Sequence, residues 1–200
     1  MKKIIITQRV EKLGKFNEIR DNIDTRLTSL INKLGFAPIL IPNNLVNINR
    51  FVKEISPSGI ILSGGGDPHK KDLRYFTENK LIKISLKKKI PIIGICRGAQ
   101  VINLFFGGKL IKIKNHVKKT HTLSGPFIKN KKIKVNSYHE YGFHKDKLGK
   151  KLNLLASSLD KIVMLFSHSK YKILGIMWHP ERYLRIRNFD KKLMINFFMK

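Results

Sequence analysis

The protein has 200 residues, of which 41 are Lys or Arg and 13 are Asp or Glu, so its formal charge at neutral pH is +28. Apolar residues make up 42% of the chain, which is enough for the core of one folded domain and argues against charge-driven disorder. A single cysteine excludes a disulfide framework and any zinc site made of several thiolates. We expect one domain over residues 1–200.

The N-terminal sequence and the hydropathy predict a cytoplasmic protein. The opening segment MKKIIITQRVEK has only three consecutive apolar residues, too few for the core of a signal peptide. No stretch approaches the ~20 apolar residues of a membrane helix. We therefore expect no membrane partner.

The positive charge has two interpretations. Lys, Ile and Asn are frequent along the whole chain, as coding bias in an AT-rich genome produces. Alternatively, the charge attracts an anionic partner, which is either a nucleic acid or a small phosphorylated or carboxylated substrate. The one local concentration, residues 129–134, lacks the interleaved aromatic side chains of a base-stacking surface. We expect no specific nucleic-acid partner.

Short apolar runs alternate with amphipathic stretches, which predicts strands alternating with helices. In chain order, we expect strands at 4–7, 39–41, 59–63 and 92–95, with helices at 23–34, 48–55 and 76–86 between them. Further strand-like runs follow near 111, 133–135, 163–166 and 173–177, before a last helix from about 190. This order predicts an α/β fold with a mainly parallel sheet and antiparallel additions.

Ligands of such sheets bind beyond the carboxyl ends of the strands, where several polar or small residues of this chain are expected. They are Gln8 and Arg9 after the first strand, residues 64–67 after the third, Cys96 after the fourth and His179 after the last.

The segment IIGICRGAQ has the spacing of a nucleophile elbow, with Gly94 and Gly98 two residues on either side of Cys96. The tight turn leaves no room for side chains at those positions, and the amides of the following helix favour a thiolate. The alternative is a buried structural cysteine, which is common for free thiols. The glycine spacing favours the nucleophile.

A cysteine nucleophile requires a base, and His179 lies just past an apolar strand in GIMWHPER. Glu181 follows two residues later and can orient the ring by accepting a proton from one imidazole nitrogen. By itself this histidine reads as an incidental surface residue. Together with the cysteine elbow it indicates a catalytic pair.

The segment SGGGD at 63–67 follows a strand, and its bare backbone amides can approach a ligand. We expect it to form half of an oxyanion hole, with the amide of Arg97 as the other half. A tight turn without a ligand is the alternative.

These three elements resemble the class I, triad-type glutamine amidotransferases over the whole chain. The resemblance implies a flavodoxin-like doubly wound sheet. It also implies that Cys96 attacks a γ-glutamyl carbonyl, that His179 and Glu181 complete the triad, and that Gly65 and Arg97 provide the oxyanion amides.

The same resemblance assigns residues to the glutamyl part of the substrate. Gln100 matches the residue that helps to hold it. The segment VNSYHEYG, with Ser137, Tyr138 and His139, resembles the stretch that receives the α-amino and α-carboxylate groups; an ordinary strand end is the alternative.

Two activities of this family remain open, because the chain has no synthetase domain. One is an amidase subunit that supplies ammonia to a separate partner. The other is a γ-glutamyl hydrolase, which Arg97 and Ala99 favour, because partnered subunits commonly carry Leu and His there. The segment RYFTE at 74–78 departs from the hydrolase pattern, which often has an acidic residue after the arginine.

The segments TQRV, NEIRDNID and LIPNN resemble a narrower subgroup, the γ-glutamyl-CDP-amidate hydrolases of capsule phosphoramidate synthesis. A nucleotide diphosphate leaving group would give the basic residues a purpose. Those that follow strand ends are Arg9, His69, Lys70 and Lys71. Alternatively, Glu18, Arg20, Asp21 and Asp24 form only a capped, charged first helical turn.

We expect neither a cofactor nor a metal. His116 with His121 and His139 with His144 are close in sequence, but no carboxylate cluster is evident to complete a ligand set. A third functional class, a nucleic-acid-binding protein on an inactive amidotransferase fold, disagrees with an intact triad.

Overall fold

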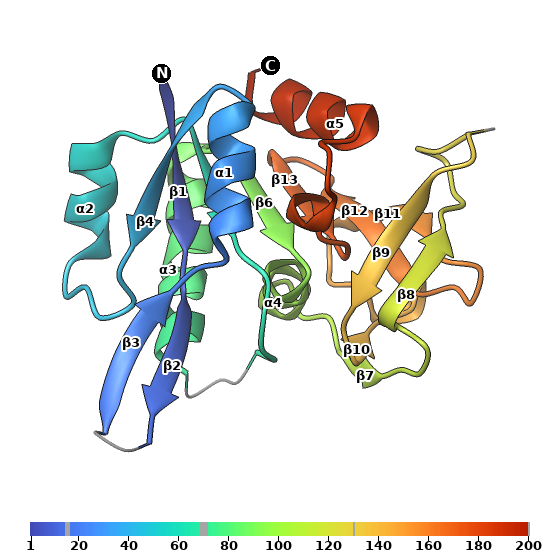
Figure 1. Ribbon diagram of the computed structural model, residues 1–200, viewed down its shortest axis with the longest axis horizontal. Coiled ribbons are helices and arrows are strands. Elements are labelled where there is room, and N and C mark those ends of the chain that lie inside the picture. Colours follow the sequence, from blue (N-terminus) through green and yellow to red (C-terminus); the bar gives the residue numbers. More distant parts are fainter. Residues whose placement is uncertain (15–16, 69–71, 130, 200) are drawn as a thin grey trace.

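The computed structural model describes residues 1–14, 17–68, 72–129 and 131–199. Within these residues, seven strands form one central sheet (Figure 1). In spatial order they are β11 (Leu152–Ser157), β12 (Val163–His168), β13 (Ile173–Ile176), β6 (Ile92–Ile95), β5 (Gly59–Leu62), β1 (Lys2–Thr7) and β4 (Phe36–Ile41). The strands from β13 to β4 are parallel, and β11 and β12 add an antiparallel edge.

Helices cover both faces of this sheet, which confirms the predicted doubly wound α/β fold. In Figure 1, α1 lies over the near face, while α3 and α4 lie behind the sheet. The helices are α1 (Thr25–Lys33), α2 (Ile48–Ile55), α3 (Leu73–Lys88), α4 (Arg97–Phe105) and α5 (Asn188–Met199). None of the described helices is long and apolar enough to cross a membrane.

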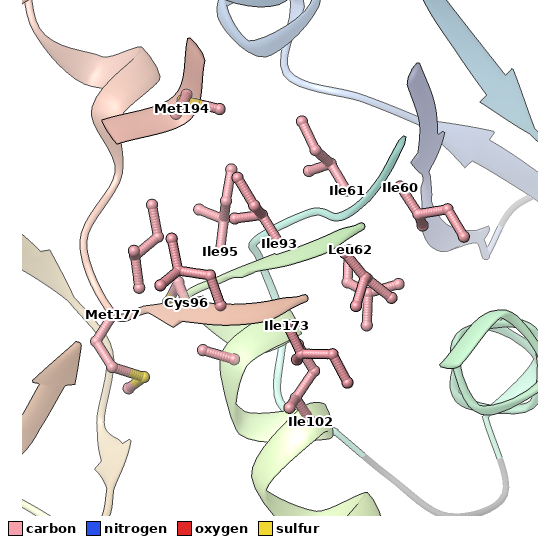
Figure 2. Packing of buried hydrophobic residues seen from close by; sticks show 14 of the residues in the cluster. Ile60, Ile61, Leu62, Ile93, Ile95, Cys96, Ile102, Ile173, Met177 and Met194 are labelled. Atoms are coloured by element: carbon pink, nitrogen blue, oxygen red, sulfur yellow. The ribbon is translucent and has the colours of Figure 1, made fainter. Parts of the chain in front are cut away.

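The core explains why the central strands read as continuous apolar runs. Every residue of β5 and β6 is buried, because helices cover both faces of these strands. Figure 2 shows this apolar cluster, in which the Cys96 side chain lies with isoleucines of β5 and β6. The nucleophile candidate is therefore held by the buried apolar core.

Helix α3 begins earlier than predicted. The Asp72 side chain accepts a hydrogen bond from the backbone N–H of Arg74 at 3.1 Å and so caps the helix at its first turn. The segment RYFTE is thus helical, and Arg74 and Glu78 lie one turn apart on a buried face.

A hairpin follows the first strand where the sequence indicated a loop and a helical turn. It consists of β2 (Arg9–Leu13) and β3 (Glu18–Asn22). The interpretation of Glu18, Arg20 and Asp21 as a first helical turn is wrong, whereas Asp24 does cap α1. Both strands are largely exposed, so they lack the apolar alternation that reveals a strand.

Some of the later strand-like runs belong to the central sheet, and others form separate small sheets. β12 and β13 extend the central sheet, as expected. The runs near 111 and 133–135 instead form separate two-stranded sheets beside it (Figure 1). These pair β7 (Ile111–Lys112) with β10 (Tyr141–Gly142), and β8 (Val117–Thr122) with β9 (Lys134–Tyr138).

Candidate active site

Cys96 occupies a strained turn between β6 and α4, with φ 50° and ψ −102°. A Cβ on Gly94 would lie 2.5 Å from the Gly98 carbonyl carbon, and one on Gly98 would lie 2.1 Å from the Leu62 oxygen. Glycine is therefore required at both positions by close backbone approach. This is the geometry that the nucleophile-elbow spacing predicts.

His179 follows β13 and is held by Glu181, as the sequence predicted. Its Nδ1 lies 2.6 Å from the Glu181 Oε1, and both side chains are almost completely buried. Burial opposes the charged imidazole, but the neighbouring Cys96 sulfur and the Glu181 carboxylate outweigh it and raise the pKa of His179 to about 9. The three residues thus form one electrostatic unit.

Asn136 fixes the backbone of His179, a role that sequence reasoning missed. Its Oδ1 accepts a hydrogen bond from the His179 N–H at 2.8 Å, and its Nδ2 donates to the His179 carbonyl at 2.9 Å. Tyr138 on the same strand meets the imidazole edge-on, with ring centroids 5.8 Å apart. The only sequence signal was that Asn136 precedes Ser137 in the VNSYHEYG segment.

The glycine loop at 63–67 lies directly against the catalytic candidates. A Cβ on Gly64 would be 2.5 Å from the His179 ring, and Gly65 has a positive φ of 93°. Ser63 anchors the loop, because its Oγ donates to the Thr7 carbonyl at 2.6 Å. That the amides of Gly65 and Arg97 bind an oxyanion remains a prediction.

A network of ion pairs on α3 and at the start of α4 holds this loop. Arg74 donates to the Gly65 carbonyl at 2.8 Å and to Glu78 at 2.9 Å. Glu78 also pairs with Arg97, which in turn contacts Asp72 at 2.8 Å. Burial lowers the pKa of Arg74 to about 10, although the Glu78 charge opposes this shift. The departure at 74–78 therefore lies in a segment that holds the glycine loop.

Gln100 and His139 converge on one backbone carbonyl, that of Tyr141. Gln100 Nε2 donates to it at 2.8 Å and His139 Nδ1 at 2.9 Å. Burial, together with the charge of His116, lowers the pKa of His139 to about 3, so this ring is neutral. Within the described residues, Gln100 Oε1 and His139 Nε2 are buried acceptors without a donor.

The Arg9 side chain lies against the glycine loop. Its Nε donates to the Gly64 carbonyl at 3.2 Å, and its guanidinium fills the space where a Gly65 Cβ would stand. The sequence prediction that Arg9 lies near the site is thus supported by geometry. His69, Lys70 and Lys71 lie outside the described residues.

The Ser137 side chain contacts His116, the residue before β8. Its Oγ donates to the His116 carbonyl at 2.6 Å. That Ser137 binds the substrate remains a prediction. His116 is fully buried, and its Nε2 lies 2.9 Å from the Asp160 Oδ2.

One carboxylate, that of Asp160, lies near two of these histidines, although the sequence did not indicate it. His116, His121 and Asp160 bring one ligand atom each within 4.8 Å of one another. The two imidazoles are stacked, however, with centroids 4.0 Å apart and planes 14° apart. Parallel stacked rings do not aim their in-plane lone pairs at one ion, so this arrangement does not fit a metal.

The model of the glutamine amidotransferase class-I family matches residues 18–200. The chain therefore belongs to the class I glutamine amidotransferases. This family membership, which the cysteine elbow and the HPE segment indicated, is confirmed.

Relatives within this family differ in their activities. The γ-glutamyl-CDP-amidate hydrolase of Campylobacter jejuni is 32% identical over 189 residues, which cover 88% of this chain and 88% of the relative. The anthranilate synthase component 2 of Cyanophora paradoxa is 31% identical and is covered to 95%, again with 88% of this chain. A solved structure of a candidate GMP synthase subunit from Thermoplasma acidophilum has a TM-score of 0.74 and 25% identity, covering 100% of this chain and 93% of that one.

Proposed function

We propose that this protein hydrolyses a γ-glutamyl amide bond with Cys96 as nucleophile. The observation that carries this proposal is the arrangement of His179, hydrogen bonded to Glu181 and beside both Cys96 and the glycine loop. The Cys96 sulfur attacks the γ-carbonyl carbon, and the negative charge on the carbonyl oxygen is stabilised by the amides of Gly65 and Arg97.

His179 then transfers its proton to the leaving nitrogen, and the C–N bond breaks to leave a γ-glutamyl thioester. Water attacks the thioester carbonyl, and His179 accepts the proton that the water loses. The C–S bond breaks, glutamate leaves and the Cys96–His179 pair is restored. Glu181 keeps the imidazole in the orientation that both proton transfers require.

The glutamyl part of the substrate supplies the donors that two buried acceptors lack. Gln100 Oε1 and His139 Nε2 flank the Tyr141 carbonyl and have no partner among the described residues. An unsatisfied buried polar group costs about 1–3 kcal/mol, which a donor from the substrate recovers. The α-ammonium of a γ-glutamyl group offers up to three donors to this position.

The leaving group that we propose is anionic and linked to a nucleotide. Arg9 supports this, because it brings a guanidinium to the edge of the glycine loop. Arginine binds two oxygens of a diphosphate at once, and each charge-assisted hydrogen bond contributes about 1.5–3 kcal/mol. The activity for which the Campylobacter relative is named agrees with such a substrate, γ-glutamyl-CDP-amidate.

Steady-state kinetics on two substrates test this function. γ-Glutamyl-CDP-amidate carries the anionic leaving group, and γ-glutamyl-p-nitroanilide carries a neutral one. We expect Cys96→Ser to abolish glutamate release from both. Arg9→Ala should lower kcat/KM for the nucleotide substrate by roughly one to two powers of ten, well beyond its effect on the anilide.

Three results would contradict parts of this proposal. Turnover by Cys96→Ser would exclude the thioester route. An equal effect of Arg9→Ala on both substrates, or no effect, would contradict the proposal that Arg9 binds an anionic leaving group. Ammonia release from glutamine that appears only with an added synthase subunit would favour the activity that the name of the Cyanophora relative describes.

A further inference from the structure

We propose that the β2–β3 hairpin is a specificity element for the leaving group, and that Asp21 and Asn43 are the positioning residues that hold it against the glycine loop. This inference rests on the proposed hydrolysis of γ-glutamyl amides. It adds a role for the hairpin, which projects from the carboxyl end of β1 beside the site (Figure 1).

The far strand of the hairpin is clamped to the loop after β4. One Asp21 oxygen accepts the backbone N–H of Asn43 at 2.8 Å, and the other accepts its side-chain Nδ2 at 2.6 Å. The same Nδ2 donates to the Gln8 carbonyl at 3.2 Å. Asn43 is 6% exposed and Asp21 is half-buried, so these charge-assisted bonds are partly shielded from water.

This clamp joins two of the segments that resemble the γ-glutamyl-CDP-amidate hydrolases. Asp21 belongs to NEIRDNID and Asn43 to LIPNN. The register pairs Val10 with Asp21 and Arg9 with Asn22, so the clamp lies next to the residue pair that carries Arg9. A rigid far strand therefore fixes where the Arg9 backbone leaves β1.

The clamp also connects to the buried ion network. Thr77 Oγ1 donates to the Asn43 carbonyl at 3.1 Å, and Thr77 lies on α3 between Arg74 and Glu78. Arg74 in turn holds the Gly65 carbonyl. Helix α3 thus holds the hairpin through Asn43 and the glycine loop through Arg74, and so fixes the distance between them.

Arg9 is a cation at the loop that is available to a ligand. Arg74 and Arg97 are paired with Glu78 and Asp72. None of the ion pairs found among the described residues includes Arg9. The Arg9 guanidinium is therefore available to pair with a phosphate-bearing leaving group.

The test compares two charge-matched substitutions on β3. Asp21→Asn keeps the shape of the side chain but presents an amide to the Asn43 donors. Glu18→Gln removes the same charge from the same strand, where Glu18 pairs only with exposed Arg20 in the described part of the chain. kcat and KM are measured on γ-glutamyl-CDP-amidate and γ-glutamyl-p-nitroanilide, with Tm recorded for each protein.

We expect Asp21→Asn to raise KM for the nucleotide substrate about tenfold and to leave the anilide within twofold, whereas Glu18→Gln leaves both within twofold. The Asp21→Asn/Asn43→Asp double variant, which restores a carboxylate–amide pair, should recover part of the preference. If Asp21→Asn does not fold, Asn43→Ala takes its place under the same criterion.

An unchanged preference between the substrates in a folded Asp21 or Asn43 variant would overturn the proposal. Equal loss on both substrates would also overturn it, because a hairpin that only stabilises the fold has that effect. If the wild-type protein releases glutamate from neither substrate, the proposed function fails, and this outcome is distinct from failure of the hairpin role.

Discussion

The proton on His179 is held by charges on two sides of the ring. The Cys96 sulfur and the Glu181 carboxylate overcome the effect of burial and keep the pKa at about 9, above the ordinary 6.5. The imidazolium, which we propose protonates the leaving nitrogen, therefore persists through neutral pH and is lost as the pH rises through about 9.

A pH profile of kcat/KM for Glu181→Gln tests this electrostatic role. In the wild type, kcat/KM should fall on the alkaline side with an apparent pKa near 9. Removing the Glu181 charge should lower this alkaline pKa by roughly one unit and reduce kcat less than Cys96→Ser does. A profile whose alkaline limb does not move would show that Glu181 does not set the charge of the ring.

One buried carboxylate on α3 links two helices and, through Arg74, the glycine loop. Glu78 on α3 is completely buried and pairs with Arg74 on its own helix and with Arg97 at the start of α4. Arg74 continues to the Gly65 carbonyl. Removing the carboxylate leaves two buried guanidinium groups with less compensating charge.

Glu78→Gln should therefore destabilise the protein by about 3–5 kcal/mol, the usual cost of breaking a buried ion pair. Denaturant unfolding followed by circular dichroism measures this change. The matched control is Asp146→Asn, which breaks an exposed pair with Lys147 and should leave the stability nearly unchanged, because solvent screens exposed ion pairs. Equal stabilities for the two variants would show that the network contributes little.

For the whole molecule, the charge of +28 predicts weak, nonspecific affinity for nucleic acids. Binding of a labelled DNA duplex should weaken by at least about tenfold between 50 and 200 mM salt, because each neutralised phosphate releases counterions. Cys96→Ser should bind equally. Tight binding to a defined sequence at physiological salt would contradict this expectation and favour a nucleic-acid function.

Much of the fold and of the candidate triad could be predicted from local patterns. Buried parallel strands read as apolar runs, and Cys96 and His179 each follow such a run, which predicts that both lie at the carboxyl edge of the sheet. Glycines on both sides of Cys96 indicate a turn that tolerates no side chain. Glu181 lies two residues from His179, so their contact depends on few backbone torsions. Each of these signals is local in sequence.

Contacts between residues far apart in the sequence could not be predicted, because no local pattern indicates them. The hairpin was missed because both of its faces are largely exposed, and only its neighbours reveal it. Asp21 meets Asn43, Arg97 meets Glu78, and Asn136 meets His179 across 22, 19 and 43 positions. The sequence does not show which of many possible partners a carboxylate or an amide side chain contacts. Only the packed structure decides which one it finds, because desolvation makes each buried polar group satisfy its bonds with whatever the fold brings near.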